Sequence, residues 1–185
     1  MAYVKSSIPR PGDGAGCAAT RKSQIILVDV EDVDTEPTRE VGNCNVTGDL
    51  TLKAEAKAIS IYATASSIQV TEELSGDPDA EGIKTGIVFD HPGNSVAIKN
   101  FIEVFKNRGV IAIVQECDGT DSGRPQIMGR VCNPLRLSLE TKMDGEATKR
   151  TLTWKQVLPD KFLAGEYSGK MPTVAEAAAS AVGGA

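Results

Sequence analysis

Hydrophobic positions recur with a helical period in one segment of this chain, residues 95–108. Ile98, Phe101, Ile102 and Phe105 lie at i, i+3, i+4 and i+7, so they form one stripe of a helix, and the opposite face is polar. A helix with a single apolar stripe buries that stripe against another element. The pattern therefore predicts a helix in residues 95–108 that packs on a sheet through these four side chains.

Residues at both ends of this segment have the chemistry of helix caps. Asn94 or Ser95 can accept a hydrogen bond from a free backbone N–H at the start. Gly109 can adopt the left-handed conformation just past the end, and Lys106 and Arg108 lie where the helix dipole favours positive charge. We expect the helix to end at this glycine.

Most of the remaining chain shows strand-like patterns. Residues 23–30, SQIILVDV, are typical of a strand buried on both faces, and Leu135, Leu137 and Leu139 alternate as in a strand with one wet face. Further strands are expected in residues 46–52, 59–64, 68–72, 83–90, 110–117 and 149–158. The turn spacing predicts a mainly β fold, an antiparallel β-sandwich or barrel of about eight strands with one flanking α-helix.

Composition divides the chain into one domain with two simpler ends. Residues 1–22 are rich in Pro and Gly and predict an extended N-terminal arm, and residues 23–170 predict the sandwich or barrel domain. Residues 171–185 are rich in Ala and predict a flexible C-terminal tail.

Charge and composition narrow the classes of function. The 185 residues carry a formal net charge of −5, which argues against a general nucleic-acid binder because phosphate contact needs a basic surface. No stretch has the length of a signal peptide core or a membrane span. We therefore expect synthesis in the cytoplasm and read Cys17, Cys44, Cys117 and Cys132 as reduced thiols.

Candidate chemistry is sparse. His91, the one histidine, precedes Pro92 and has no nucleophile or carboxylate pair with a defined role near it, so a turn or strand-end role is favoured over a general base. The segment Asp77, Asp79, Glu81 resembles the first half of a calcium loop, but Val88 occupies the position of the bidentate Glu. We expect no enzyme, no cofactor and a solvated acidic loop, with calcium as the weaker reading.

Acidic residues are concentrated in residues 29–40 and 71–81. Such runs usually form solvated faces. In a ring-forming protein, acids on the inner wall would also repel a passing polyanion. The acids that we assign to a channel wall or to a loop between rings are Asp29, Glu31, Asp32, Asp34, Glu36, Glu40, Glu72 and Glu73.

Three stretches, residues 66–95, 95–119 and 129–156, resemble the tail tube (major tail) proteins of long-tailed bacteriophages. Their shared order is strand, acidic loop, strand, His-Pro-Gly turn, one helix, a buried strand, an Asn-Pro turn and two closing strands. The resemblance covers about half of the chain and includes no catalytic motif. The inner-tube proteins of type VI secretion and contractile systems share this fold but match the turns less well.

The resemblance implies a structural virion protein. Copies would join edge to edge into hexameric rings that stack into a tube, and DNA would pass through the tube during ejection without specific binding. The helix would lie outside the inner barrel, and residues 29–46 or the termini would bridge neighbouring rings. Implied partners are the tape-measure, tail-terminator and baseplate proteins, and the implied location is the virion tail, without a membrane.

Two other classes stay open at this point. A β-sandwich module that binds carbohydrate or another ligand would need exposed aromatic residues, yet aromatics make up 4% of the chain and Trp154 alternates with Leu152 as a core residue does. A phage head-decoration or tail-terminator protein would form a trimer or a single ring that does not stack. Oligomer mass separates these classes from a tube subunit.

Overall fold

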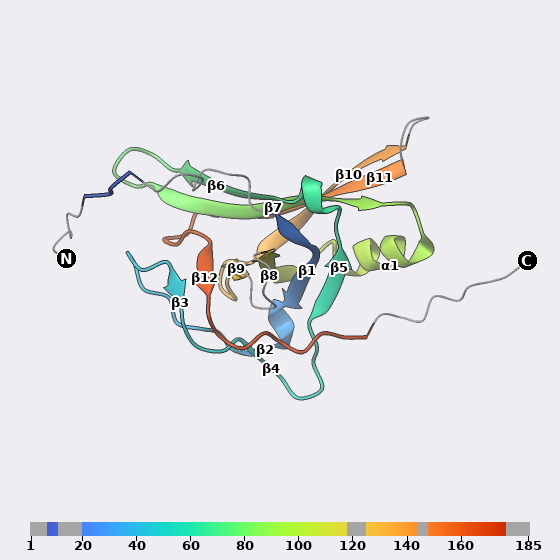
Figure 1. Ribbon diagram of the computed structural model, residues 1–185, viewed down its shortest axis with the longest axis horizontal. Coiled ribbons are helices and arrows are strands. Elements are labelled where there is room, and N and C mark those ends of the chain that lie inside the picture. The colour runs from blue at the N-terminus through green and yellow to red at the C-terminus, as the bar shows by residue number, and fades with distance from the viewer. Residues whose placement is uncertain (1–6, 11–19, 118–124, 144–147, 177–185) are drawn as a thin grey trace, which may run out of the picture.

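Two sets of strands that meet at one corner form the body of the protein (Figure 1). The computed structural model describes residues 7–10, 20–117, 125–143 and 148–176. Within these ranges ten strands belong to one sheet, two form a separate ribbon and one segment is α-helical. The mainly β fold with one flanking helix is therefore confirmed.

Seven of the eight predicted strands are present among the eight longer strands of the described chain, whereas the predicted strand at 46–52 is two short strands and the longer strand at 125–128 was not predicted. The eight longer strands are β1 (Arg21–Asp29), β5 (Ile59–Tyr62), β6 (Gln69–Ser75), β7 (Gly82–Pro92), β8 (Gly109–Glu116), β9 (Pro125–Met128), β10 (Leu135–Met143) and β11 (Thr148–Gln156). The patterns do not resolve four short strands, which are β2 (Val33–Thr35), β3 (Asn45–Val46), β4 (Thr51–Leu52) and β12 (Gly165–Tyr167). Two short 3-10 turns are η1 (Val30–Asp32) and η2 (Ala65–Ser67).

The large sheet folds over on itself and has two halves. The four-stranded half has the order β6-β7-β11-β10, and the six-stranded half has the order β5-β1-β8-β9-β12-β3. They join where Leu135 and Arg136 of β10 pair with Val110 and Gly109 of β8. Among the described pairs only β12 with β3 is parallel, and β1 and β5 cross the direction of β6 and β7 (Figure 1).

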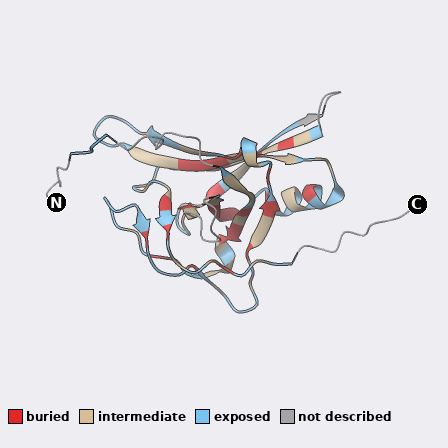
Figure 2. Ribbon diagram, viewed as in Figure 1, coloured by how far each residue is buried: buried red, intermediate tan, exposed pale blue. Residues whose placement is uncertain are grey.

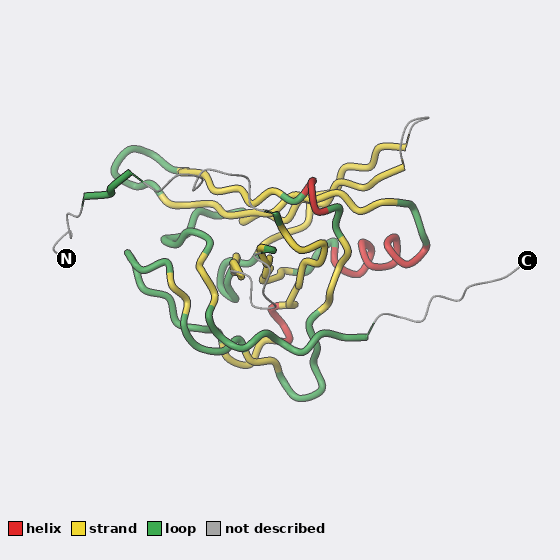
Figure 3. The backbone as a smooth tube through the Cα atoms, viewed as in Figure 1, coloured by secondary structure: helices red, strands yellow, loops and turns green. Residues whose placement is uncertain are grey.

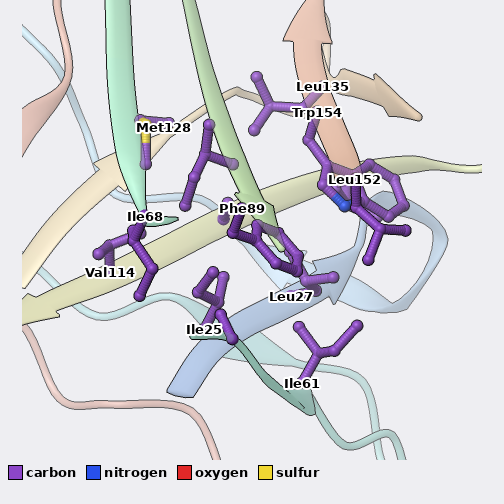
Figure 4. Packing of buried hydrophobic residues seen from close by; sticks show 14 of the residues in the cluster. Ile25, Leu27, Ile61, Ile68, Phe89, Val114, Met128, Leu135, Leu152 and Trp154 are labelled. Atoms are coloured by element: carbon purple, nitrogen blue, oxygen red, sulfur yellow. The ribbon is translucent and has the colours of Figure 1, made fainter. Parts of the chain in front are cut away.

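The main core fills the space between the two halves. Trp154, Leu152 and Phe89 point inward from the four-stranded half and meet Ile25 and Leu27 of β1 (Figure 4). All five side chains are fully buried, and buried residues concentrate in the strands at the centre of the molecule (Figure 2). The prediction that Trp154 is a core residue is therefore confirmed.

A second core lies on the far face of the six-stranded half. Val28, Ile111, Ile113 and Ile127 are buried there with Tyr167, and the β2–β4 ribbon lies over them through Val33 and Leu52. Strands β1 and β8 are therefore buried on both faces, which explains their continuous apolar sequences.

Helix α1 (Val96–Phe105) packs on the main core through its predicted stripe. Ile98 and Phe105 are buried, Phe101 and Ile102 are partly buried, and Phe105 meets Trp154 edge to face at 6.3 Å between ring centroids. Ser95 caps the start by accepting a hydrogen bond from Ile98 N, whereas Asn94 accepts one from Arg150. Of the two cap candidates, Ser95 is the cap.

The predicted role of Gly109 is wrong. Helix α1 ends three residues before Arg108 with Lys106 as its C-cap, and Gly109 is the first residue of β8 without a left-handed conformation. A Cβ at this position would lie 2.5 Å from Pro134 Cγ. A glycine is needed here because β8 passes close to the turn before β10.

The C-terminal segment contacts the domain up to Ala175, beyond the boundary that the sequence predicts. Ala58 N donates to Thr173 O at 2.9 Å, Ala175 N donates to Ala58 O at 2.8 Å, and Met171 and Val174 pack on the second core. The C-terminal segment accordingly runs past the start of β5 (Figure 3). The predicted tail boundary at residue 171 is thus too early. At the other end, β1 begins two residues before the predicted domain; residues 1–6 and 11–19 of the arm and 177–185 of the tail lie outside the described residues.

Candidate functional site

Asp29 has a structural role rather than the predicted role in a wall or loop. Its carboxylate is buried, accepts a hydrogen bond from Glu31 N and lies 2.6 Å from Arg108 Nη1. The hydrogen bond and charge of Asp29 raise the pKa of Arg108. This ion pair ties the end of β1 to the segment that follows α1.

Three more of the predicted acids are bound within the chain. Glu36 contacts Arg130 Nε at 3.4 Å, Glu72 Oε1 accepts a hydrogen bond from Ala164 N at 2.7 Å, and Glu73 contacts Lys155 Nζ at 2.8 Å. A fourth, Glu31, lies 3.5 Å from Nη1 of the same Arg108 that Asp29 binds. Asp32 lies in η1 and Asp34 in β2, on a different side of the molecule from β6 (Figure 1), and Glu40 lies in the turn before β3. The structure therefore does not gather the eight acids on one face.

The calcium candidate forms a turn between β6 and β7. Ala80 N donates to Asp77 O at 2.9 Å, Asp79 has a φ of 70°, and Gly76 has a φ of 140°. Among the described residues, no three His, Cys, Asp or Glu side chains gather as a metal site would require. His91 lies in β7, where its Nδ1 is 2.9 Å from Tyr62 O.

Strand β6 is an open edge of the four-stranded half. Asp90 N donates to Ser67 Oγ and Asp90 O accepts from Thr64 N, so residue 90 and every second residue of β7 direct their backbone groups toward β6. In this register the backbone groups of Gln69, Thr71 and Glu73 form hydrogen bonds with the backbone of β7. The backbone groups of Val70, Glu72 and Leu74 consequently point away from the sheet, where no other described strand pairs with them.

The opposite side of the same half is open as well. Strand β10 pairs with β11 along its whole length but with β8 only at Leu135 and Arg136. Within the described residues, the second side of β10 from Leu137 to Met143 has no partner strand. The four-stranded half thus carries two free edges, and these edges are the candidate functional site.

The outward face of the four-stranded half is mainly polar. Side chains alternate along each strand, so one set packs on the core and the other set points outside. The registers of β6, β7, β11 and β10 place the outward side chains of the four strands on one face. The outward residues include Gln69, Thr71, Glu73, Lys84, Val88, Asp90, Thr151, Thr153, Lys155, Arg136, Ser138 and Glu140. Cations and carboxylates pair here, as Lys149 Nζ does with Asp90 Oδ2 at 2.7 Å.

Gly86 allows one of these pairs to form across a strand. Lys155 lies opposite Gly86 in β7, and its side chain reaches past that strand to Glu73 in β6. A Cβ on Gly86 would lie 2.9 Å from Trp154 O and 3.2 Å from Lys155 Cγ. The glycine leaves room for the Lys155 side chain to cross β7.

Replacing Gly86 with alanine should lower the free energy of unfolding by about 1–3 kcal/mol, because the added methyl overpacks the Trp154 backbone and displaces Lys155. Urea denaturation would measure the change. Gly42→Ala is the control for adding a methyl where no atom lies within 4 Å, although its φ of 86° adds local strain. Equal stability of Gly86→Ala and the wild type would contradict the close approach.

Lys155→Met should raise the pKa of Glu73, because the hydrogen bond and charge of Lys155 hold that pKa below its ordinary value. The ion pair favours the folded state above the unfolded-state pKa and is lost as the pH falls through the lowered folded-state value. Carboxyl NMR titration measures the pKa. Lys84→Met, which removes a weaker influence on the same carboxylate, should raise it less; an unchanged value in Lys155→Met would contradict the pair.

Sequence reasoning identified residues of β6 and β10 but not their role as free edges. The sequence of β6, QVTEELS, has no Pro or Lys of the kind that often protects an edge, yet this signal becomes meaningful only once the strand order is known. In the described part of the chain, no helix has the length and apolar character needed to cross a membrane. No family model, curated protein or solved structure matches this chain.

Proposed function

We propose that this protein is a structural subunit of a phage tail tube, built from stacked hexameric rings that conduct DNA during ejection. The observation that carries the proposal is the pair of free edges on opposite sides of one four-stranded antiparallel half. Pairing β6 of one copy with β10 of the next is a heterologous contact, and such contacts close into rings when the rotation between copies allows it. Closure would also remove both edges from solvent.

In such a ring the outward face of the four-stranded half lines the channel. The opposite face is packed against the six-stranded half and α1, which would form the outer layer. Of the eight acids assigned from the sequence, Glu73 lies on this face by register. The channel wall in this proposal is therefore mixed in charge rather than acidic.

Paired charges on that wall suit a passing polyanion. Lys155 lies 2.8 Å from Glu73 and Lys149 lies 2.7 Å from Asp90, so these two of the cations on the wall already have a carboxylate partner. A phosphate would have to compete with that carboxylate to bind the lysine, which weakens non-specific attachment of DNA. The proposal includes assembly with tape-measure, tail-terminator and baseplate proteins and a location in the virion tail after synthesis in the host cytoplasm.

Negative-stain electron microscopy of the purified chain at high concentration, combined with its elution mass, tests the proposal. We expect hexameric rings and hollow tubes. A monomer at every concentration would contradict it and favour a ligand-binding module. Trimers, or single rings that never stack, would favour a head-decoration or tail-terminator protein instead.

A further inference from the structure

Exposed aliphatic side chains gather on turns at one end of the four-stranded half. Val157 and Leu158 follow β11, and Val131 precedes β10; with Leu163 they are between 40% and 66% exposed. Asp160 pairs with Ile83 at the start of β7, which places these turns toward the β6–β7 end of the molecule (Figure 1). We call Val131, Val157, Leu158 and Leu163 the apolar end face.

Hydrogen bonds hold the turns of the apolar end face in place. Asn133 Nδ2 donates to Leu158 O at 3.0 Å and Gln156 Nε2 donates to Asn133 O at 3.1 Å, which joins the turn before β10 to the turn after β11. Arg39 Nη1 donates to Leu163 O at 3.1 Å. Exposed side chains on turns fixed in this way lose little further freedom when they bind a partner.

A charged cluster lies beneath the same turns. Arg130 is 3.4 Å from Glu36 and 3.6 Å from Asp160, and its guanidinium lies 5.0 Å from the centre of the Phe162 ring. The Asp160 side chain is largely buried. This cluster connects the segment after β2, the turn before β10 and the segment after β11 into one rigid surface.

The other end of the molecule offers a matching surface. Helix α1 lies there, and its outward side exposes Val96 and Val104 at 70% and 57% (Figure 1). The same side of the helix also exposes Lys99, Glu103 and the C-cap Lys106, which together carry one net positive charge. Apolar residues are therefore present at both ends, so contact between the ends of two copies would bury both sets.

Charge also complements between the two ends. The β6–β7 turn, next to the apolar end face, exposes Asp77, Asp79 and Glu81 and has no basic residue. These acids would meet Lys99 and Lys106 of a second copy placed end to end. Like ends, by contrast, would bring three carboxylates against three carboxylates, which electrostatics disfavours.

We infer that the apolar end face binds the α1 end of a second copy of this chain, and that this contact stacks one ring on the next. The contact is heterologous and does not close on itself, so its repetition produces a filament of rings. The inference rests on the proposed function, because stacking presupposes rings. It assigns the stacking contact to the turns at positions 131 and 157–163, rather than to residues 29–46.

A double variant, Val157→Glu with Leu158→Glu, tests the inference. Both side chains are exposed, so we expect an unchanged thermal midpoint and intact rings, but at least about a tenfold loss of tube length by electron microscopy. Tyr62→Glu adds a charge at an exposed residue of β5, outside both proposed contact surfaces, and should leave tubes normal. Normal tubes in the double variant would overturn the inference alone. A wild type without rings, or with rings that never stack, would overturn the proposed function and, with it, the inference.

The reactivity of Cys132 provides a second test in which Val131, Val157, Leu158 and Leu163 of the apolar end face are unchanged. It is exposed and lies between Val131 and Asn133, so a variant with Cys17, Cys44 and Cys117 changed to serine retains one thiol at the contact. Its reaction with a maleimide should be at least about tenfold slower in tubes than in isolated rings, because the neighbouring copy blocks access. Equal rates in the two states would overturn the assignment.

Discussion

Replacing Glu72 with proline should abolish ring formation while the subunit still folds. The N–H of Glu72 points away from β7, so its loss removes no hydrogen bond within the sheet, whereas a neighbouring strand could no longer pair through it. Elution mass and electron microscopy should show a monomer at concentrations where the wild type forms rings.

Two variants separate the effect of the proline from other changes at this edge. Glu72→Ala also loses the hydrogen bond from Ala164 N but keeps its own N–H, so it should still form rings. Thr71→Pro removes an N–H that bonds β7 and should destabilise the fold itself. Rings in Glu72→Pro that match the wild type would mean that β6 is not a subunit contact.

Replacing Trp154 with alanine should cause the largest loss of stability, about 3–5 kcal/mol in the free energy of unfolding. Its side chain is fully buried between the two halves (Figure 4). It also makes an edge-to-face contact with Phe105 of α1. The substitution leaves a cavity that joins the sheet and the helix. Urea denaturation followed by circular dichroism would measure the loss.

Trp154→Phe is the matched control because it keeps a ring at the same site. Among the described atoms the Trp154 Nε1–H has no hydrogen-bond partner, so phenylalanine removes an unsatisfied donor as well as some volume. We expect its loss of stability to be well below that of the alanine variant. Equal losses in both variants would contradict a role based on packing of the aromatic ring.

Local patterns were sufficient for the helix, for most of the longer strands and for the main core residues. The i, i+3, i+4, i+7 stripe identified the four side chains by which α1 packs, and the alternation of Leu152 with Trp154 identified the inward face of β11. These features depend on neighbours within one turn or one strand, which a single sequence records directly.

Long-range features were not predictable in this way. Asp29 and Arg108 are 79 residues apart in the chain, so the acidic run gave no sign that its first member is buried in an ion pair. Gly109 followed a helix and suggested a cap, but its close approach to Pro134 decides its role. Which strands form the free edges likewise depends on the pairing order of the whole sheet.

The sequence predicted a candidate site made of acidic side chains, whereas the structure indicates one made of two strand edges. The acids predicted for a wall or loop are largely bound within the chain, as Asp29 is by Arg108 and Glu73 by Lys155. The surface proposed for assembly consists of backbone N–H and C=O groups of β6 and β10. These groups are present whatever side chains the strands have. A composition of exposed polar residues cannot distinguish such an edge from an ordinary solvated strand.

Amide hydrogen exchange in assembled rings, compared with free subunits, tests the central claim most directly. Samples exchanged as rings are dissociated and read residue by residue by NMR. Edge pairing predicts that the amides of Val70, Glu72 and Leu74 exchange rapidly in free subunits and become protected in rings, while those of Thr71 and Glu73 are protected in both states. Rings in which the amides of Val70, Glu72 and Leu74 still exchange freely would contradict the account.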